Sequence, residues 1–151
     1  MSTMKSCLIL LVCLLLTSFV QAQTAPNLQL GYTYKVETGV VGKEVYVSGQ
    51  RPYNANGELV GAGNLQVQTQ QVFQNLIAAL DRVGMTMRNV KQVTYHLRGV
   101  PGQVDASASQ LSSSVGSGFF GQTTPGVQET KSLEKIARDG VLVEVEVVAV
   151  K

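Results

Sequence analysis

VYVSGQ, residues 45–50, is the stretch around which the rest of this sequence is organised. Three residues that favour β-structure are followed abruptly by Ser, Gly and Gln, and Arg51 and Pro52 end the run. The pattern predicts a buried strand with an unusual end. Two interpretations of that end stay open. Either the strand runs into a turn, or Gly49, which has no Cβ, lets a ligand or another backbone come close.

Residues 1–22 have the three parts of a secretory signal peptide. Lys5 supplies the positive charge, Leu8–Val20 is almost wholly apolar, and VQA at 20–22 has the small-residue form of a cleavage site. The apolar run is shorter than the roughly 20 residues that a membrane span needs. The sequence therefore predicts cleavage near Ala22 and a secreted or periplasmic protein with a single domain at residues 23–151.

Composition excludes several kinds of site from the mature chain. Both cysteines, Cys7 and Cys13, lie in the signal, so disulfides, thiolate metal sites and a cysteine nucleophile are excluded. His96 is the one histidine, which rules out a two-histidine zinc motif, and we expect no metal and no cofactor. The 12 Lys and Arg residues nearly balance the 10 Asp and Glu residues and form no basic run. We therefore expect no nucleic-acid partner and, after cleavage, no membrane.

The predicted order of elements is two strands, a helix, a strand, a helix and two strands. The first helix has the clearest pattern, because apolar residues recur at helical spacing over 65–83 between a candidate N-cap, Asn64, and a helix stop, Gly84. The second helix, at 103–118, is rich in Ser and Ala, and the pair of Phe residues at 119–120 is expected to anchor its end in the core. The strands are expected at 30–36, 44–48, 89–97, 128–136 and 141–150.

The strand expected at 141–150 has two apolar faces, one of which is interrupted by Glu144 and Glu146. Two apolar faces indicate a central strand that is covered on both sides. Two helices can cover only one face of a sheet, which is an α+β arrangement. The other face would then be an exposed apolar patch, and this predicts a homo-oligomer packed through the open faces of its sheets.

Several short stretches, taken in order, resemble the Rid family, which is also called RidA/YjgF or endoribonuclease L-PSP. These stretches are LGYT at 30–33, VYVSGQ at 45–50, GELV at 57–60, QTQQ at 68–71 and VEVE at 143–146. The resemblance implies a chorismate-mutase-like fold with two helices on one face of the sheet. It also implies a homotrimer with ligand clefts at its subunit interfaces. The best-studied members hydrolyse reactive enamines and imines, such as 2-aminoacrylate, to a keto acid and ammonia.

The resemblance assigns roles only where the motifs match. Glu144 falls on the acidic residue that is associated with the catalytic water, and Tyr32, which follows Gly31, falls on the tyrosine of the cleft. The Ser-Gly-Gln of the family's cleft is matched by Ser48, Gly49 and Gln50. By this resemblance, Glu144 and Tyr32 are the candidate catalytic residues.

The chain departs from the family pattern after Pro125. Deaminating members have Pro, a small residue and then Arg, which holds the substrate carboxylate in a bidentate salt bridge. Here the run is PGVQET at 125–130. Gln128 takes the Arg position if one residue is inserted, Val127 takes it if none is, and Thr130 completes this side of the expected cleft. Neither candidate for the Arg position carries a charge.

Losing that arginine would cost roughly 2–5 kcal/mol of carboxylate binding, unless Arg51 or Arg98 supplies the charge. The leading hypothesis is therefore an exported Rid-like protein whose intersubunit clefts bind or convert an unidentified small molecule, and not an efficient 2-aminoacrylate deaminase. One alternative is an enamine or imine deaminase that uses Tyr32, Glu144 and a relocated arginine. Another is a non-catalytic trimeric protein-interaction module. A ribonuclease is least supported, because the sequence has no basic patch.

Overall fold

The computed structural model describes residues 34–38 and 42–151. The expected signal peptide and the candidate residues Gly31 and Tyr32 lie outside them. The elements are β1 (Tyr34–Thr38), β2 (Lys43–Gln50), α2 (Leu65–Asp81), a short 3-10 helix η1 (Met87–Asn89), β3 (Val90–Arg98), α3 (Ala106–Phe120), β4 (Val127–Leu133) and β5 (Val143–Val150). The order of strands and longer helices is the predicted one. Across the described ranges, no helix has the length and apolar character that a bilayer crossing requires.

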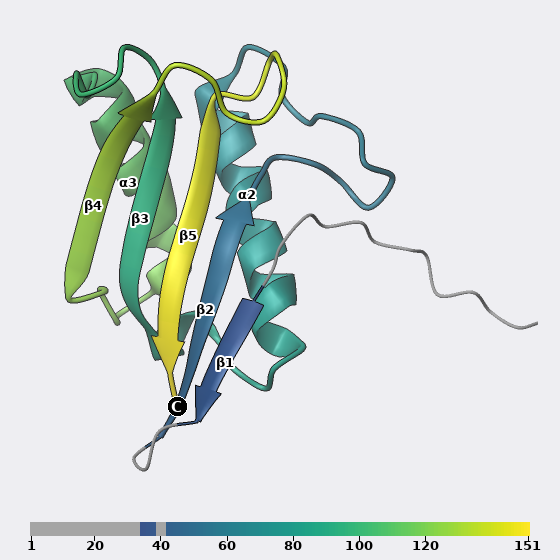
Figure 1. The fold of residues 1–151 in the computed structure, drawn as a ribbon, viewed down its shortest axis with the longest axis vertical. Coiled ribbons are helices and arrows are strands. Elements are labelled where there is room, and N and C mark those ends of the chain that lie inside the picture. Colours follow the sequence, from purple (N-terminus) through teal and green to yellow (C-terminus); the bar gives the residue numbers. More distant parts are fainter. Residues whose placement is uncertain (1–33, 39–41) are drawn as a thin grey trace, which may run out of the picture.

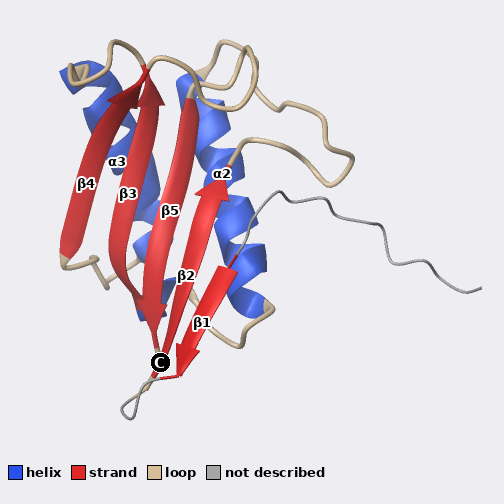
Figure 2. Cartoon of the chain, viewed as in Figure 1, coloured by secondary structure: helices blue, strands red, loops and turns tan. Residues whose placement is uncertain are grey.

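The five strands form one mixed sheet in the order β1-β2-β5-β3-β4 (Figure 1). Neighbouring strands are antiparallel except β3 and β4, which run parallel. Strand β5, the last in the chain, therefore lies in the middle of the sheet, as its two apolar faces predicted. Figure 2 shows both long helices on the same side of the sheet, so no described helix covers the other face. The predicted α+β class, with two helices on one face, is confirmed.

Helix α2 begins and ends where its sequence signals lie. The side chain of Asn64 accepts a hydrogen bond from the backbone N–H of Val67, which makes it the N-cap. At the other end, Gly84 adopts a positive φ of 69°. The backbone N–H of Met85 donates to the carbonyl of Leu80, the Schellman pattern that closes a helix. The helix stops two residues before the predicted limit, because this closure uses the residues between Asp81 and Gly84.

Helix α3 is built from small residues because it packs closely on its neighbours. Asp105 caps it by accepting from the backbone N–H of Ala108 at 2.8 Å. A Cβ placed on Gly116 would lie 2.6 Å from Cζ of Phe73 in α2, so no larger residue fits at this crossing without movement. The Ser- and Gly-rich composition, which lowers helix propensity, therefore allows the two helices to approach.

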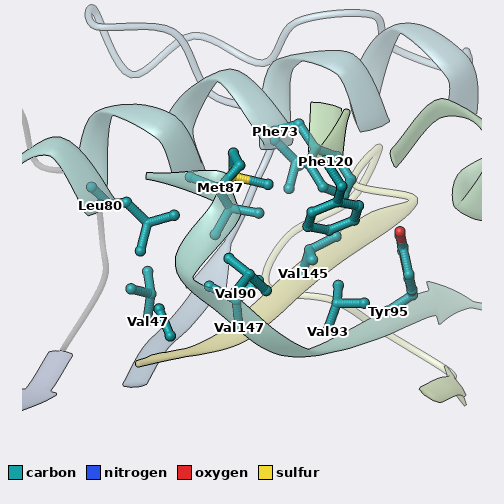
Figure 3. Close-up of a cluster of buried hydrophobic side chains, with 14 of the residues drawn as sticks. Val47, Phe73, Leu80, Met87, Val90, Val93, Tyr95, Phe120, Val145 and Val147 are labelled. Atoms are coloured by element: carbon teal, nitrogen blue, oxygen red, sulfur yellow. The ribbon is translucent and has the colours of Figure 1, made fainter. Parts of the chain in front are cut away.

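The face of the sheet under the helices is the hydrophobic core (Figure 3). Alternate residues of the three central strands point into it and are almost completely buried, among them Val47, Val93 and Val145. Phe73 stacks on Phe119 with 5.1 Å between ring centroids and meets the edge of Phe120 at 5.6 Å. The Phe pair thus anchors the end of α3 in the core, as predicted, although it forms the last turn of the helix.

The two edge strands differ from their predicted limits. Strand β1 continues beyond its predicted end at residue 36 to Thr38, because Glu37 and Thr38 pair with Glu44 and Lys43. Strand β4 ends at Leu133 and not at 136, and the chain then turns so that Ile136 is buried outside the sheet. Edge strands are paired on one side only, so their ends depend on a single neighbour and the alternation pattern defines them poorly.

Candidate functional site

The end of β2 is a β-bulge. The pairing with β5 shifts between Val47, which lies opposite Val147, and Gln50, which lies opposite Val145. Ser48 and Gly49 fill the bulge, and Gly49 has a positive φ of 49°. A Cβ on Gly49 would lie 3.4 Å from the carboxylate carbon of Glu144. The group that comes close to Gly49 is the side chain of Glu144 and not, as one of the two interpretations expected, a ligand or another backbone.

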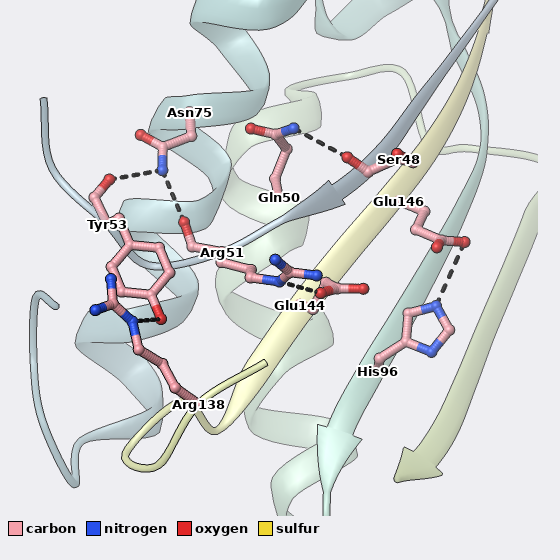
Figure 4. Close-up of polar contacts among 9 residues, drawn as sticks. All are labelled: Ser48, Gln50, Arg51, Tyr53, Asn75, His96, Arg138, Glu144 and Glu146. Atoms are coloured by element: carbon pink, nitrogen blue, oxygen red, sulfur yellow. Dashed lines mark hydrogen bonds and ion pairs between the residues drawn. The ribbon is translucent and has the colours of Figure 1, made fainter. Parts of the chain in front are cut away.

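Glu144 forms an ion pair with Arg51, the residue that follows β2. The distance from Arg51 Nε to Glu144 Oε2 is 2.5 Å, and the side chains are 34% and 13% exposed. Figure 4 shows the guanidinium reaching across from the end of β2 to the carboxylate on β5. The structure therefore brings together Gly49, Arg51 and Glu144, which the sequence analysis selected for separate reasons.

Asn75 of α2 holds the chain segment that carries Arg51. Its side-chain amide donates to the carbonyls of Arg51 at 2.8 Å and Tyr53 at 2.9 Å (Figure 4). Buried side-chain amides satisfy backbone groups that would otherwise lose their hydrogen bonds. Asn75 is therefore a positioning residue for the end of β2. The sequence analysis did not predict this role.

Gln68 plays a similar part at the start of β5. It is completely buried, and its amide nitrogen donates to the carbonyls of Gly61 and Gly140. Its amide oxygen accepts from the backbone N–H of Leu142 at 2.8 Å. One side chain thus ties two loops to the strand that carries Glu144. The sequence signal was a polar residue on the apolar stripe of a helix, which indicates a buried hydrogen-bonding role.

The uncovered face of the sheet continues the site with His96, Glu146 and Tyr46. His96 on β3 lies directly opposite Glu144 on β5, and its Nε2 lies 3.4 Å from Glu146 Oε2 (Figure 4). Burial, and then the hydrogen bond and charge of Glu146, raise the pKa of Tyr46 to about 12. His96, Glu144 and Glu146 are the described residues whose donor atoms lie close enough together to hold a metal ion.

The remaining candidate residues lie elsewhere. Gln128 and Thr130 are on edge strand β4, and the hydroxyl of Thr130 accepts a hydrogen bond from the hydroxyl of Ser109 in α3, on the helix-covered side of the sheet. Within one chain they are therefore not brought to Glu144. Arg98 ends β3 on the uncovered face, where its side chain is exposed. Gln50 is buried and donates to the carbonyl of Ser48 at 3.0 Å.

This sheet order, with two helices on one face and a carboxylate against a bulged strand, defines an α+β protein of the YjgF type. The chain belongs to the endoribonuclease L-PSP family, whose model matches residues 22–151. A RutC family protein of Pyrococcus abyssi is 30% identical over 112 residues, which is 74% of this chain and 81% of that protein.

Solved structures agree with this membership. A protein described as a putative endoribonuclease from Thermotoga maritima is 32% identical with a TM-score of 0.62, over 74% of this chain and 82% of that one. The Rid-family protein YyfA from Yersinia pestis, described as of unknown function, is 25% identical with a TM-score of 0.63, over 79% of this chain and all of that one (100%). The relation to Rid and YjgF proteins is thus one of family and of fold.

Proposed function

We propose that this protein is an exported Rid-like protein that binds or converts a small molecule at Glu144, and that it is not an efficient 2-aminoacrylate deaminase. The single observation that carries the proposal is the Arg51–Glu144 ion pair beside Gly49. In the proposed trimer, a cleft at the subunit interface would bring Gln128 and Thr130 of one subunit toward Glu144 of another. The signal-like residues 1–22 support export.

The ion pair changes what Glu144 can do. Arg51 binds Oε2, so Oε1 is the oxygen that a water molecule or a ligand would meet. The oxygen that Arg51 occupies cannot accept a proton from a water molecule, so only one of the two carboxylate oxygens is left for general-base work. This property favours binding, or slow conversion, over rapid activation of a hydrolytic water.

Arg51 also offers a positive charge to the ligand. Its contact with Glu144 uses Nε, which leaves the N–H bonds of the two Nη atoms to other acceptors. A carboxylate could be held there in a bidentate manner. Arg51 thus takes the part of the arginine that the run PGVQET lacks, and we propose a small anionic or carboxylate-bearing molecule as the ligand.

One alternative is an enamine or imine deaminase that hydrolyses its substrate to a carbonyl compound and ammonia. The observation that favours it is the place of Glu144, which is 13% exposed and lies on the residue that the resemblance associates with the catalytic water. In that case the deaminase would use Tyr32, Glu144 and Arg51 as its site residues.

The test uses residues 23–151 and an amino-acid oxidase that generates imines in the presence of semicarbazide. We expect no decrease in semicarbazone formation across several imino acids, together with thermal stabilisation of the protein by some small carboxylates. A clear decrease that Glu144→Ala abolishes would overturn the proposal in favour of the deaminase. If neither hydrolysis nor stabilisation is seen and the protein instead captures a partner protein, the non-catalytic interaction module replaces both.

A further inference from the structure

Three side chains of the kinds that can ligate a metal ion lie close together on the uncovered face of the sheet. Strands β3 and β5 are paired so that His96 lies opposite Glu144, while Glu146 follows two residues along β5 on the same face. One donor atom from each side chain lies within 4.8 Å of the donors of the other two. Figure 4 shows the imidazole of His96 beside Glu146, with Glu144 nearby on β5.

The burial of His96 also points to a metal ligand. Its side chain is only 12% exposed, and both ring nitrogens are buried without a hydrogen-bond partner among the described residues. Its Nε2 lies 3.4 Å from the nearest oxygen of Glu146, which is too long for a good hydrogen bond. A buried imidazole loses its hydration and normally regains hydrogen bonds or a metal bond in exchange. Within the described residues this one has neither.

We propose that His96, Glu144 and Glu146 form a binding site for a divalent transition-metal ion of the Zn²⁺ class. One imidazole and two carboxylates are a donor set that suits Zn²⁺ and Mn²⁺ better than Mg²⁺, which favours oxygen ligands alone. Donors around a zinc ion lie about 3–4 Å apart, because each is about 2 Å from the metal. Small rotations of the three side chains would close the present spacing to these values.

The charges of the cluster are compatible with an added cation. Glu144 and Glu146 bring two negative charges, and the guanidinium of Arg51 offsets one of them. Arg51 occupies Oε2 of Glu144, so Oε1 is the oxygen available to the ion. The proposal does not rest on the proposed function. The sequence analysis expected no zinc motif because the chain has a single histidine. The number of histidines does not reveal that the pairing of β3 and β5 brings His96 beside two carboxylates.

The test is calorimetric titration of untagged residues 23–151, stripped with EDTA, with Zn²⁺, Mn²⁺ and Mg²⁺ in turn. This range contains the family match apart from residue 22 and every described element, and it leaves out both cysteines, which would bind zinc on their own. We expect one Zn²⁺ per chain and no measurable heat with Mg²⁺. Because His96 is the one histidine, replacing it reports on this site alone.

His96→Gln and Glu146→Gln should each weaken Zn²⁺ binding by roughly tenfold or more. The matched control is Glu129→Gln, an exposed carboxylate on β4 that pairs with Lys131 at 3.3 Å, and it should leave binding unchanged. Cobalt(II) gives a second readout, a visible absorption band that both site variants should remove. No Zn²⁺ binding, binding that survives both site variants, or equal weakening by Glu129→Gln would each overturn the proposal. Circular dichroism spectra identify any variant that fails to fold, and the other site variant then decides.

Discussion

The two faces of the sheet carry opposite chemistry although the same strands build both. On the helix-covered face, Val143 and Val145 are completely buried. Between them in the chain, Glu144 points to the uncovered face and meets Arg51. Because neighbouring residues of a strand point to opposite faces, the core and the candidate site are one residue apart. A shift of one residue in register would exchange the residues of the core with those of the site. The packing of the core therefore also fixes the geometry of the site.

The separation between the faces is incomplete at one place. Helix α2 belongs to the covered side, yet Gln68 and Asn75 reach from it to the loops that lead into the site. The core layer therefore positions Arg51 and the start of β5 through hydrogen bonds as well as through packing.

The largest effect should come from the covered face. Phe73→Ala removes a fully buried ring that contacts Phe119, Phe120 and Tyr95, and should lower the free energy of unfolding by about 3–5 kcal/mol. Urea unfolding measures it. The control is Ile77→Ala on the same helix, where the side chain is 45% exposed and a loss under about 1 kcal/mol is expected. Equal losses in both variants would show that burial under the helices does not decide how much a side chain contributes to stability.

The connection between the faces should rank second. Gln68→Met keeps the volume but leaves the carbonyl of Gly140 and the N–H of Leu142 without their partner, while the carbonyl of Gly61 keeps the N–H of Asn64. We expect a loss of about 2 kcal/mol in the free energy of unfolding, roughly 1 kcal/mol for each group left without a partner. Gln66→Met, on the exposed side of α2, is the matched control and should change little. A stable Gln68→Met variant would show that packing alone holds these loops.

The uncovered face should affect binding more than stability. Arg51→Ala should weaken the binding of small carboxylates about tenfold, or about 1.4 kcal/mol, while unfolding changes by under about 1 kcal/mol, because the side chain is 34% exposed. Ligand-dependent thermal shifts measure the affinity. Arg98→Ala, an exposed arginine on the same face, serves as the comparison. If Arg98→Ala weakens binding and Arg51→Ala does not, the charge was assigned to the wrong arginine.

The smallest effect concerns two tyrosines, one on each face. The pKa of Tyr46 is raised from 10.0 to about 12, so the unfolded chain loses this proton first as the pH rises. Its contribution to stability is complete below pH 10 and is lost toward pH 12. It should stay under about 1 kcal/mol, because Tyr46 is 37% exposed.

The measurement is unfolding between pH 9 and 12 in a Tyr95→Phe background, since burial also raises the pKa of Tyr95. Adding Tyr46→Phe should make the loss of stability with rising pH shallower. An unchanged slope would contradict the raised pKa of Tyr46.

The sequence predicted the elements that have a strong period. Helix α2 and strand β5 were found because their apolar residues repeat at 3.6 and 2 residues, and Asn64 and Gly84 mark the helix ends. The uncovered face followed from counting helices against sheet faces. These inferences use only neighbours in the chain or the number of layers, and both can be read from a pattern.

The contacts of the site could not be predicted in the same way. Arg51 and Glu144 are 93 residues apart, and their pairing depends on where the bulge at Gly49 places the end of β2. Gln68 and Gly140 are likewise far apart in the sequence, at a separation of 72 residues. A periodic pattern specifies which face a residue occupies but not which loop lies above it. Such contacts follow only after the sheet order is known.

The position of β5 has a consequence for how this chain is assembled. The strand that joins β2 to β3 follows the other four strands in the sequence, so the two halves of the sheet have no shared edge until residues 143–150 are present. Pairings between residues distant in sequence form slowly, because the loop entropy is lost before the contacts are gained. A chain that stops before Val143 would expose two strand edges together and be prone to aggregation. Residues 143–150 therefore complete the sheet and, at the same time, bring Glu144 into the site.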